Sequence, residues 1–308
     1  MILAVCLNPT FQNTMVFSSF LEGEVNRCNR YRLDPSGKGV NVSRVITQLG
    51  GDVLHLTHLG GYRRQELIDM LQAESINTIW ADSGSPIRTC TTIIHEKRGT
   101  TTELIEEPLQ VAPTTEAAIR ELFSQHIRQC SVLVISGTRA PGYSRHLYAD
   151  MVQEAKSAHV RVILDVKGED LNSCLVYNPD VIKPNLSEFA STFMPGHTVF
   201  EQQADTGIKD SVIELMKRLY EANGTAVVLT RGRFPTWLYD SCGFTEIPVR
   251  AVQAVNTVGS PCCLGLATHP THRRELSSNF REFFLHHGSP HTKQAPSQAF
   301  GGAFPMSA

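Results

Sequence analysis

The sequence predicts an α/β fold in which helices cover both faces of a mostly parallel sheet. Short runs of apolar, β-branched residues recur along the chain, and segments with apolar residues at helical spacing lie between them. Strands that alternate with helices in this way form a doubly wound sheet. The chain has 308 residues, so it can bury a large core as one generous domain or as two smaller ones.

The strand and helix signals follow one another in order. The predicted strands are residues 2–8, 52–60, 132–137, 161–166 and 226–232, and the predicted helices include 63–74 and 210–224. The second of these helices closes on Gly224, a residue typical of a helix C-terminus. The opening MILAVCLNP is apolar for only seven residues and has no basic leader, so it predicts a first buried strand rather than a signal peptide.

Two segments break this alternation. Residues 11–34 and 88–107 are rich in threonine and prone to form strands, and the second has a hairpin turn at EKRG, 96–99. We expect them to form a small antiparallel flap attached to the main sheet. An ordinary pair of edge hairpins fits the same pattern.

The chain after Ser260 has a different character. Residues 261–308 hold five of the twelve histidines and no strongly periodic helix beyond ELSSNFREFFLHH, 275–287. This pattern predicts an atypical, loosely ordered C-terminal tail. An altered reading frame near the codons of HHG, 286–288, is a second explanation, which the nucleotide sequence of the gene would test.

Composition argues against two classes of protein. With a formal net charge of -2 and 19% charged residues, the chain lacks the strongly basic balance of a nucleic-acid binder. No apolar run approaches the roughly 20 residues of a membrane span.

The eight cysteines show no C-x-x-C spacing, which predicts free thiols in a reducing cytoplasm. The adjacent Cys262 and Cys263 are poorly placed to share one zinc ion.

The segment DPSGKGVNVSRVITQLG, 34–50, predicts a helix start that binds an anion. Gly37 and Gly39 precede a helical pattern. Glycines at this place let a ligand approach the backbone N–H groups and the positive end of the helix. The segment is neither a Walker A loop nor a G-x-G-x-x-G fingerprint, and an ordinary turn before a helix gives the same pattern.

Basic residues near this segment strengthen the interpretation. Arg27, Lys38 and Arg88 come from separate segments close to the flap and the glycine loop. A phosphorylated ligand requires cations that converge in this way. Exposed, solvated charges would give the same sequence pattern.

The stretch VIKPNLSEF, 181–189, is a more specific signal. After a strand and a proline, Asn185 and Glu188 stand three residues apart, so both can face one point from a first helical turn. This arrangement fits a hydrated Mg²⁺ ion. It equally fits a capping box, with Asn185 as the N-cap residue and Glu188 at the third helical position.

The order and spacing of these motifs resemble the ribokinase/PfkB sugar kinases, and within them the branch of 1-phosphofructokinase and tagatose-6-phosphate kinase. The matching stretches are LNP (7–9), VNR (25–27), GKGVNVSRV (37–45), LGG (59–61), RTC (88–90), SGTRAPG (136–142), KPNLSE (183–188) and VNTVGS (255–260). They cover the chain nearly end to end up to Ser260, which makes the resemblance much stronger than any one motif.

The resemblance implies one kinase domain over residues 1–308, with a ribokinase-like three-layer αβα fold and a β-flap lid formed by about 11–34 and 88–107. It implies ATP and Mg²⁺ as cofactors, a sugar phosphate as substrate and a homodimer formed through the lid. The substrate-binding positions would be Gln12, Arg27, Gly37, Lys38, Gly39, Asn41, Arg88 and Thr138. The cofactor-binding positions would be Lys183, Asn185, Glu188, Thr230 and Gly232, with Asn185 and Glu188 holding Mg²⁺ through water. Gly259 and Ser260 would begin the catalytic anion hole at a helix N-terminus.

Two departures from the family pattern concern the substrate side. Gln12 stands where the family has an aspartate that binds a sugar hydroxyl. The acceptor sugar can therefore differ from that of the relatives. Ser36 stands where the first glycine of a G-G-K-G run is common, which is a milder change.

A third departure concerns the chemistry itself. The family loop G-[AS]-G-D ends in an aspartate that acts as general base, whereas here Gly259 and Ser260 are followed by Pro261 and Cys262. Inserting two residues after Ser260 would bring LGLA, 264–267, into register with the family's AGLA. The missing pair therefore corresponds to Gly-Asp, and the proline also removes one backbone N–H donor.

The resemblance, with these departures from it, therefore implies an ATP-dependent sugar-phosphate kinase whose catalysis is impaired. Loss of a general base typically lowers the rate by about 10²- to 10⁴-fold. The thiol of Cys262 is a poor replacement, because an ordinary thiol is mostly protonated at neutral pH. The alternative is a non-catalytic protein that binds sugar phosphate or nucleotide in the same cleft. A nicotinamide-dependent dehydrogenase fits the sheet but lacks the dinucleotide fingerprint.

Overall fold

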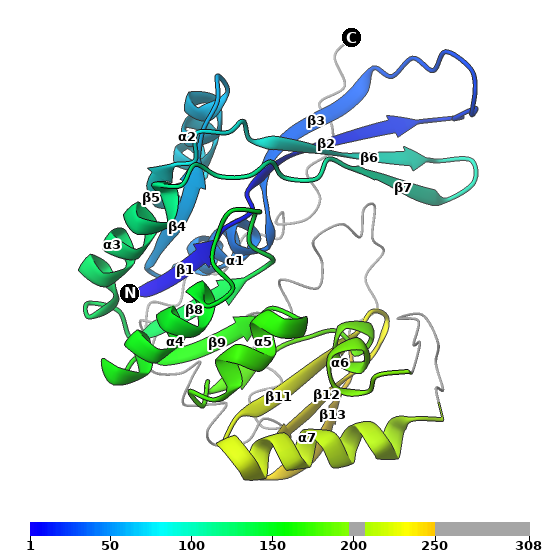
Figure 1. Ribbon diagram of the computed structural model, residues 1–308. Helices are drawn as coiled ribbons and strands as arrows, with labels where there is room; N and C mark the ends of the chain where they lie inside the picture. Colours follow the sequence, from blue (N-terminus) through cyan, green and yellow to red (C-terminus); the bar gives the residue numbers. More distant parts are fainter. Residues whose placement is uncertain (197–206, 250–308) are drawn as a thin grey trace.

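The computed structural model of the chain describes residues 1–196 and 207–249 (Figure 1). The VNTVGS loop with Gly259 and Ser260 lies outside the described residues, as do Cys262, Cys263 and the tail 261–308. The roles expected for those residues therefore stay predictions.

A nine-stranded sheet forms the centre of the molecule. Its order is β13-β12-β11-β10-β9-β8-β1-β4-β5, and neighbours from β11 to β5 pair in parallel. The strands are β1 Ile2–Cys6, β4 Val53–Leu59, β5 Asn77–Asp82, β8 Val132–Ser136, β9 Arg161–Asp165, β10 Val181–Ile182, β11 Ala226–Arg231, β12 Phe234–Asp240 and β13 Gly243–Ile247. β12 and β13 add to one edge in antiparallel pairing. The prediction of a mostly parallel sheet is confirmed, and all five strands predicted from the sequence are present.

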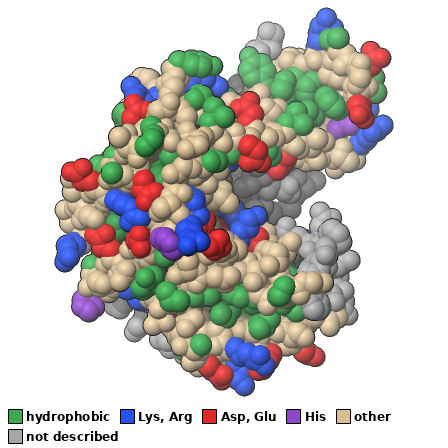
Figure 2. Space-filling view, viewed as in Figure 1, with side chains coloured by type: hydrophobic (Ala, Val, Ile, Leu, Met, Phe, Trp, Pro, Cys, Tyr) green, Lys and Arg blue, Asp and Glu red, His purple; other side chains and the backbone are tan. Residues whose placement is uncertain are grey.

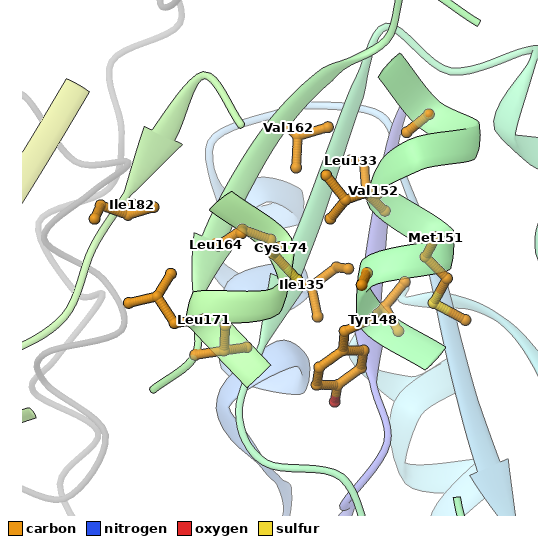
Figure 3. Close-up of a cluster of buried hydrophobic side chains, with 14 of the residues drawn as sticks. Leu133, Ile135, Tyr148, Met151, Val152, Val162, Leu164, Leu171, Cys174 and Ile182 are labelled. Carbon is orange, nitrogen blue, oxygen red and sulfur yellow. The ribbon is translucent and has the colours of Figure 1, made fainter. Parts of the chain in front are cut away.

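Helices lie on both faces of this sheet, as predicted. One face carries α1 Lys38–Gln48 and α2 Arg64–Ala73, and the other carries α3 Thr115–Ile127, α4 Leu147–Ser157, α5 Gly168–Leu175, α6 Leu186–Phe193 and α7 Lys209–Asn223. Successive strand residues point to opposite faces of the sheet. Leu3 and Val5 therefore belong to the core on the side of α3 to α7, whereas Ala4 belongs to the core on the side of α1. Figure 3 shows the larger core, where Ile135 and Leu164 from the sheet meet Val152 and Leu171 from α4 and α5. In the described part of the chain, no helix is long and apolar enough to cross a membrane.

A second, four-stranded sheet projects away from the main one (Figure 1), and we call it the lid sheet. Its order is β3 Arg30–Ser36, β2 Thr10–Phe17, β6 Arg88–His95 and β7 Thr100–Ile105. The predicted small sheet is confirmed, but the prediction that it is antiparallel was wrong, because β2 and β6 pair in parallel. β2 follows β1, and β6 follows β5. Since β1 and β5 point the same way in the main sheet, the two strands that leave them run in the same sense.

The main sheet has one place where the order of the chain reverses. From β1 the chain continues to β4 and β5 on one side, whereas β8 to β11 extend on the other. In open parallel sheets, ligands bind in the crevice outside the carboxyl ends of the strands at such a switch point. The ends of β1 and β8 therefore mark the expected place of the site.

Two buried histidines lie on β4, on the way to that edge. His55 is fully buried, and a hydrogen bond of 3.0 Å joins its Nδ1 to Ser43 Oγ on α1. His58 Nδ1 lies 2.8 Å from the hydroxyl of Tyr143. Burial lowers the pKa of both imidazoles to about 4. Both rings are therefore neutral in the folded protein at physiological pH.

Folding stability should fall as pH decreases through the window that these histidines define. Above pH 6.5 the imidazoles are neutral in both states. Between about 6.5 and 4 the unfolded chain takes up protons that the folded protein excludes, which costs about 3 kcal/mol per fully buried ring. Urea unfolding measured across this range should show the loss, and His55→Gln should reduce it.

Exposed His146→Gln is the matched control and should leave the pH dependence unchanged. If His55→Gln and the unchanged protein lose stability equally between pH 6.5 and 4, His55 is not held neutral by the fold.

Candidate active site

A pocket of about 180 Å³ lies at the carboxyl ends of β1, β8 and β9. It is lined by Cys6, Asn8, Gly37, Lys38, Arg88, Gly137, Thr138, Asp165, Val166, Lys167 and Glu188. These residues come from the three strand ends, the start of α1, the first turn of α6 and the first residue of β6 in the lid sheet. The pocket therefore occupies the topological switch point and is reached by the lid.

Asn8 and Thr138 connect the two sides of the switch point. Asn8 follows β1 and Thr138 follows β8, and Asn8 Nδ2 donates a hydrogen bond to Thr138 Oγ1 at 3.1 Å. Asn8 is 7% exposed, yet its Oδ1 has no hydrogen-bond partner among the described residues. Nearly all buried polar atoms in proteins are paired. The described residues therefore leave one polar atom of this pocket without a partner.

The glycine loop brings the start of α1 against the end of β1. A Cβ on Gly39 would lie 2.6 Å from Cys6 Cβ and 2.9 Å from the carbonyl oxygen of Val5. Gly37 has a φ of 122°, a backbone conformation that residues other than glycine rarely adopt. Only glycines let the helix start approach this closely, and the approach places Lys38 and the positive helix end at the pocket.

A buried carboxylate holds the charged side chains of the pocket in place. Asp165, the last residue of β9, accepts a hydrogen bond from Ser136 Oγ at 2.9 Å. Its Oδ1 lies 3.3 Å from Lys183 Nζ and 3.4 Å from Lys38 Nζ. Lys38 Nζ also lies 3.3 Å from Glu188 Oε1. Asp165 therefore joins groups that come from three neighbouring strand ends and from α1.

The charge state of Asp165 follows from these partners. Burial alone would raise the pKa of the Asp165 carboxyl. The ammonium groups of Lys183 and Lys38, together with the Ser136 hydroxyl, outweigh burial and lower that pKa instead. Asp165 is thus an anion at neutral pH and keeps both lysines in fixed positions.

Asn185 and Glu188 form a capping box at the start of α6. Glu188 N donates to Asn185 Oδ1 at 2.7 Å, and Asn185 N donates to Glu188 Oε2 at 3.1 Å. The capping-box interpretation of the sequence is therefore confirmed. Because the box uses only Oε2, Oε1 of the same carboxylate remains directed at Lys38.

The remaining nucleotide-side positions lie next to this helix start. Thr230, on β11, forms an isolated parallel bridge with Asn185, and its backbone N donates to the carbonyl of Pro184 at 3.2 Å. Gly232 follows in the connection to β12 with a φ of 57°. Lys183 does not line the pocket and reaches it only through Asp165.

The lid sheet contributes a cation through Arg88. Its Nη1 donates to the backbone carbonyl of Glu106 at 3.0 Å, and its Nε has no partner in the described part of the chain. With Lys38 and Lys167, Arg88 makes three basic residues from three segments around one pocket. Such an arrangement favours a phosphate or carboxylate ligand.

Four of the substrate residues predicted from the sequence are not among those that line the pocket. One is Gly39, which packs against the end of β1, and the other three are Gln12, Asn41 and Arg27. Gln12 Nε2 donates to Thr92 Oγ1 within the lid sheet at 2.8 Å. Asn41 Oδ1 accepts from Arg44 Nη1 at 2.6 Å. Arg27 is exposed on the connection between β2 and β3. The side chains of Gln12 and Asn41 are thus hydrogen-bonded to neighbouring residues, and Arg27 lies on a solvent-exposed segment.

Sequence reasoning missed Asp165 and Lys167. Their position was the available signal, because Asp165 is the last residue of the buried strand RVILD and Lys167 follows two residues later, and polar residues at the carboxyl ends of parallel strands meet at one edge. In the sequence, Asp165 appears only as the last residue of an apolar strand, which gives no sign that its carboxylate belongs to a site. The partners that make its burial tolerable are residues 38, 136 and 183, which are distant in sequence.

The carboxylates of the site fit a hydrated magnesium ion. Asp165 and Glu188 each present an oxygen within 3.4 Å of Lys38 Nζ, so two hard oxygen donors face one small region. Mg²⁺ prefers such oxygens and usually keeps several of its waters. The described residues hold no group of three or more His, Cys, Asp or Glu side chains suited to a metal. The fit is thus to an ion held by two carboxylates and water.

Comparison with known proteins identifies relatives of the chain. The family model described as pfkB family carbohydrate kinase matches residues 7–260. The chain is 28% identical over 266 residues to a tagatose-6-phosphate kinase of Staphylococcus epidermidis, and the match covers 84% of this chain and 81% of the relative.

Solved structures show the same fold at lower identity. Phosphofructokinase-2 from Escherichia coli in complex with fructose-6-phosphate gives a TM-score of 0.72 at 20% identity, covering 84% of this chain and 83% of that one. The tetrameric inhibited form of that enzyme gives 0.73 at 21% identity, covering 86% and 85%. A possible 1-phosphofructokinase from Thermotoga maritima gives 0.70 at 23% identity, covering 79% and 75%.

Asp165→Asn should destabilise the protein strongly. Removing the charge leaves Lys183, which is 7% exposed, without a charged partner. Breaking a buried ion pair by removing one partner costs about 3–5 kcal/mol. Urea unfolding at neutral pH measures this difference.

Glu214→Gln, which removes an exposed pair with Arg218 on α7, is the control and should change stability by less than about 0.5 kcal/mol. Equal effects of the two substitutions would contradict the view that Asp165 organises a desolvated network.

Proposed function

The chain belongs to the pfkB family of carbohydrate kinases, which are phosphotransferases with an alcohol group as acceptor, and we propose that it binds ATP, Mg²⁺ and a sugar phosphate but phosphorylates the sugar only weakly. One observation supports the binding most directly. Three basic residues and two carboxylates converge in one pocket at the switch point of the sheet. Phosphoryl transfer depends mainly on positioning and on charge stabilisation, which this set of residues can supply.

The two halves of the pocket suit the two ligands. Arg88 enters from the lid sheet and suits the phosphate that the acceptor sugar already carries. Lys38 stands between Asp165 and Glu188 and suits the phosphates of the nucleotide. Thr138 offers a hydroxyl to the sugar between them. The backbone N–H groups at the start of α1 add positive potential to the same region.

Asp165 and Glu188 are the residues that would hold magnesium. The ion would neutralise charge on the phosphates of ATP. In its absence Lys38 balances the same two carboxylates. The capping box keeps Glu188 directed into the pocket, so a helix-capping interaction also positions a cofactor ligand.

The impairment rests on the loop after Thr257. Gly259 and Ser260 are followed by Pro261 and Cys262, so the aspartate that the family places here to take the proton of the sugar hydroxyl is missing. General bases contribute about 10²- to 10⁴-fold in rate, equivalent to roughly 3–5 kcal/mol at the barrier. The chain would keep the binding half of a kinase and lose most of its turnover.

The acceptor class is taken from the relatives. Their names point to tagatose 6-phosphate, fructose 6-phosphate and fructose 1-phosphate. Gln12 replaces the aspartate that these sugars would meet in the family, and its amide is occupied by Thr92. We therefore expect all three sugar phosphates to be candidates, with an order of preference that differs from the relatives.

A second function is favoured by the missing aspartate itself. A protein that binds sugar phosphate and nucleotide without turnover could report on their concentrations. The charge network and the capping box serve binding equally well without a general base. If the chain has this second function, the missing aspartate after Ser260 changes the function of the protein from catalysis to binding.

Free thiols support a cytoplasmic location for either function. The six cysteines in the described part of the chain form no disulfide. Four of them, Cys6, Cys90, Cys130 and Cys174, are buried in the fold. Proteins with several unpaired cysteines are typical of reducing compartments.

Inserting Gly-Asp after Ser260 should raise ATP-dependent phosphorylation by about 10²- to 10⁴-fold, because it restores the base and the register of the loop. Turnover is measured with fructose 1-phosphate, fructose 6-phosphate and tagatose 6-phosphate. Insertion of Gly-Asn has the same length without the base and should stay near the activity of the unmodified chain.

The outcomes separate the two functions. Turnover by the Gly-Asp variant alone supports a disabled kinase. If no variant turns over while the sugar phosphates and ATP still raise the melting temperature, the sensor function is supported. Robust turnover by the unmodified chain would refute the proposed impairment.

The lid sheet offers a surface for a second copy of the chain. Pairing places Met15 opposite Tyr31 and Ile93, and the next row on that face contains Leu33 and Leu104. Tyr31 is 66% exposed and Leu104 is 53% exposed. Figure 2 shows hydrophobic side chains gathered on the projecting lid. Exposed apolar faces of this kind mark interaction sites, and we infer a homodimer formed through this face.

Leu104→Asp should shift the protein from dimer to monomer in light scattering, because a charge on the apolar face would be buried without a partner. Thr101→Asp, on the opposite face of the same strand, is the control and should leave the mass unchanged. An unmodified chain that remains monomeric at high concentration would contradict the dimer.

A further inference from the structure

Lys167 is the residue of the pocket that neither the motifs nor the ion network accounts for. It lies two residues after Asp165, between the end of β9 and the start of α5, and it lines the pocket. Its side chain is exposed to solvent. The family motifs found in the sequence do not include this position.

The local structure does not favour a lysine here. Lys167 is the N-cap residue of α5 and makes no side-chain capping bond. N-cap positions favour Ser, Thr, Asp, Asn or Gly, since lysine has no acceptor for the free N–H groups. A cation at this end also opposes the helix dipole. Residues that break a local rule without a local benefit are typical of functional positions.

Three acids near Lys167 pair with other residues, and Glu169, in the first turn of α5, forms no ion pair with Lys167 among the described residues. Asp170, in the first turn of α5, binds Arg139 at 3.0 Å. Asp165 and Glu188 are directed at Lys38. In the described part of the chain Lys167 makes no hydrogen bond or ion pair.

The sheet order places Lys167 between the two halves of the pocket. β9 lies between β8, which carries Thr138 on the acceptor side, and β10, which leads to Lys183 and Asn185 on the nucleotide side. A phosphoryl group that passes from nucleotide to sugar must cross the end of β9. An ammonium group there meets the transferred group rather than the adenosine or the far end of the sugar.

The pocket also contains polar atoms without a partner in the described part of the chain. Asn8 Oδ1 and Arg88 Nε have no partner among the described residues, and Asn8 is 7% exposed. This observation is independent of Lys167. It indicates a polar ligand in the same place.

We propose that Lys167 is a ligand of the terminal phosphates of the bound nucleotide, and this proposal rests on the proposed function. The ammonium group forms charge-assisted hydrogen bonds to those oxygens and offsets their charge. Binding of ATP depends on Lys167, whereas binding of AMP and of the sugar phosphate does not. Such bonds are strong enough that their loss weakens ATP binding by about tenfold or more.

The test measures binding of ATP, AMP and fructose 6-phosphate by calorimetry, with magnesium present, because binding is informative even if turnover is low. Lys167→Met should weaken ATP binding at least about tenfold and leave AMP and fructose 6-phosphate unchanged. Lys167→Arg should keep most of the affinity for ATP. Lys217→Met, an exposed lysine on α7, is the matched control and should change nothing.

Thermal unfolding provides a second readout. A lysine that capped or stabilised α5 would lower the melting temperature when replaced, but a phosphate ligand at an unfavourable N-cap should leave it unchanged or raise it. A lower melting temperature for Lys167→Met, or equal weakening of ATP and AMP, would overturn the assignment.

Lys38→Met separates this inference from the function on which it rests. If Lys38→Met weakens ATP binding and Lys167→Met does not, the assignment of Lys167 fails and the kinase-type site stands. If the unmodified chain binds neither ATP nor any of the three sugar phosphates, both fail together.

Discussion

The buried carboxylate of Asp165 is the interaction on which the rest of the site depends. It holds Ser136 from β8, Lys183 from the end of β10 and Lys38 from the start of α1. The ammonium groups of Lys183 and Lys38 lower the pKa of Asp165 despite its burial, so the carboxylate stays charged. The carboxylate in turn holds the two lysine side chains in the site. Because Lys38 also meets Glu188, the same network connects the glycine loop to the capping box of α6.

We propose that this network serves binding, whereas catalysis depends on a separate segment of the chain. The groups that we propose to bind phosphates are fixed by strand ends and helix starts, which the packing of the core places at the switch point. The general base of the family lies instead in one loop, and in this sequence that loop lacks its aspartate. The proposed loss of the base leaves the cations and the lid in place, because they belong to other segments of the chain.

The fold could be predicted from sequence to a large extent, and the site only in part. The alternation of apolar strands with amphipathic helices indicated the parallel sheet, and Gly224 ends α7 in the left-handed conformation as predicted. The lid strands were recognised, but the parallel pairing of β2 with β6 was not, because it depends on the direction of β1 and β5. Lys38, Arg88, Thr138 and Glu188 line the pocket, whereas Gln12, Arg27 and Asn41 do not.

The sequence by itself determined the fold class, the glycine-rich helix start and the absence of an aspartate after Ser260, because each is a matter of local periodicity or of adjacent residues. For Asn185 and Glu188 it left both a capping box and a magnesium site open, and the structure shows the capping box. Only the tertiary structure decided that Asp165 is a buried anion shared by two lysines and that Lys167 and Asn8 face the same pocket. Asn8 and Thr138 are 130 positions apart in the chain and Lys38 and Asp165 are 127 apart, whereas Lys183 is closer to Asp165. The burial of a side chain and its hydrogen-bond and ion-pair partners depend on which strand ends become neighbours. The packing of the whole sheet decides which strand ends those are.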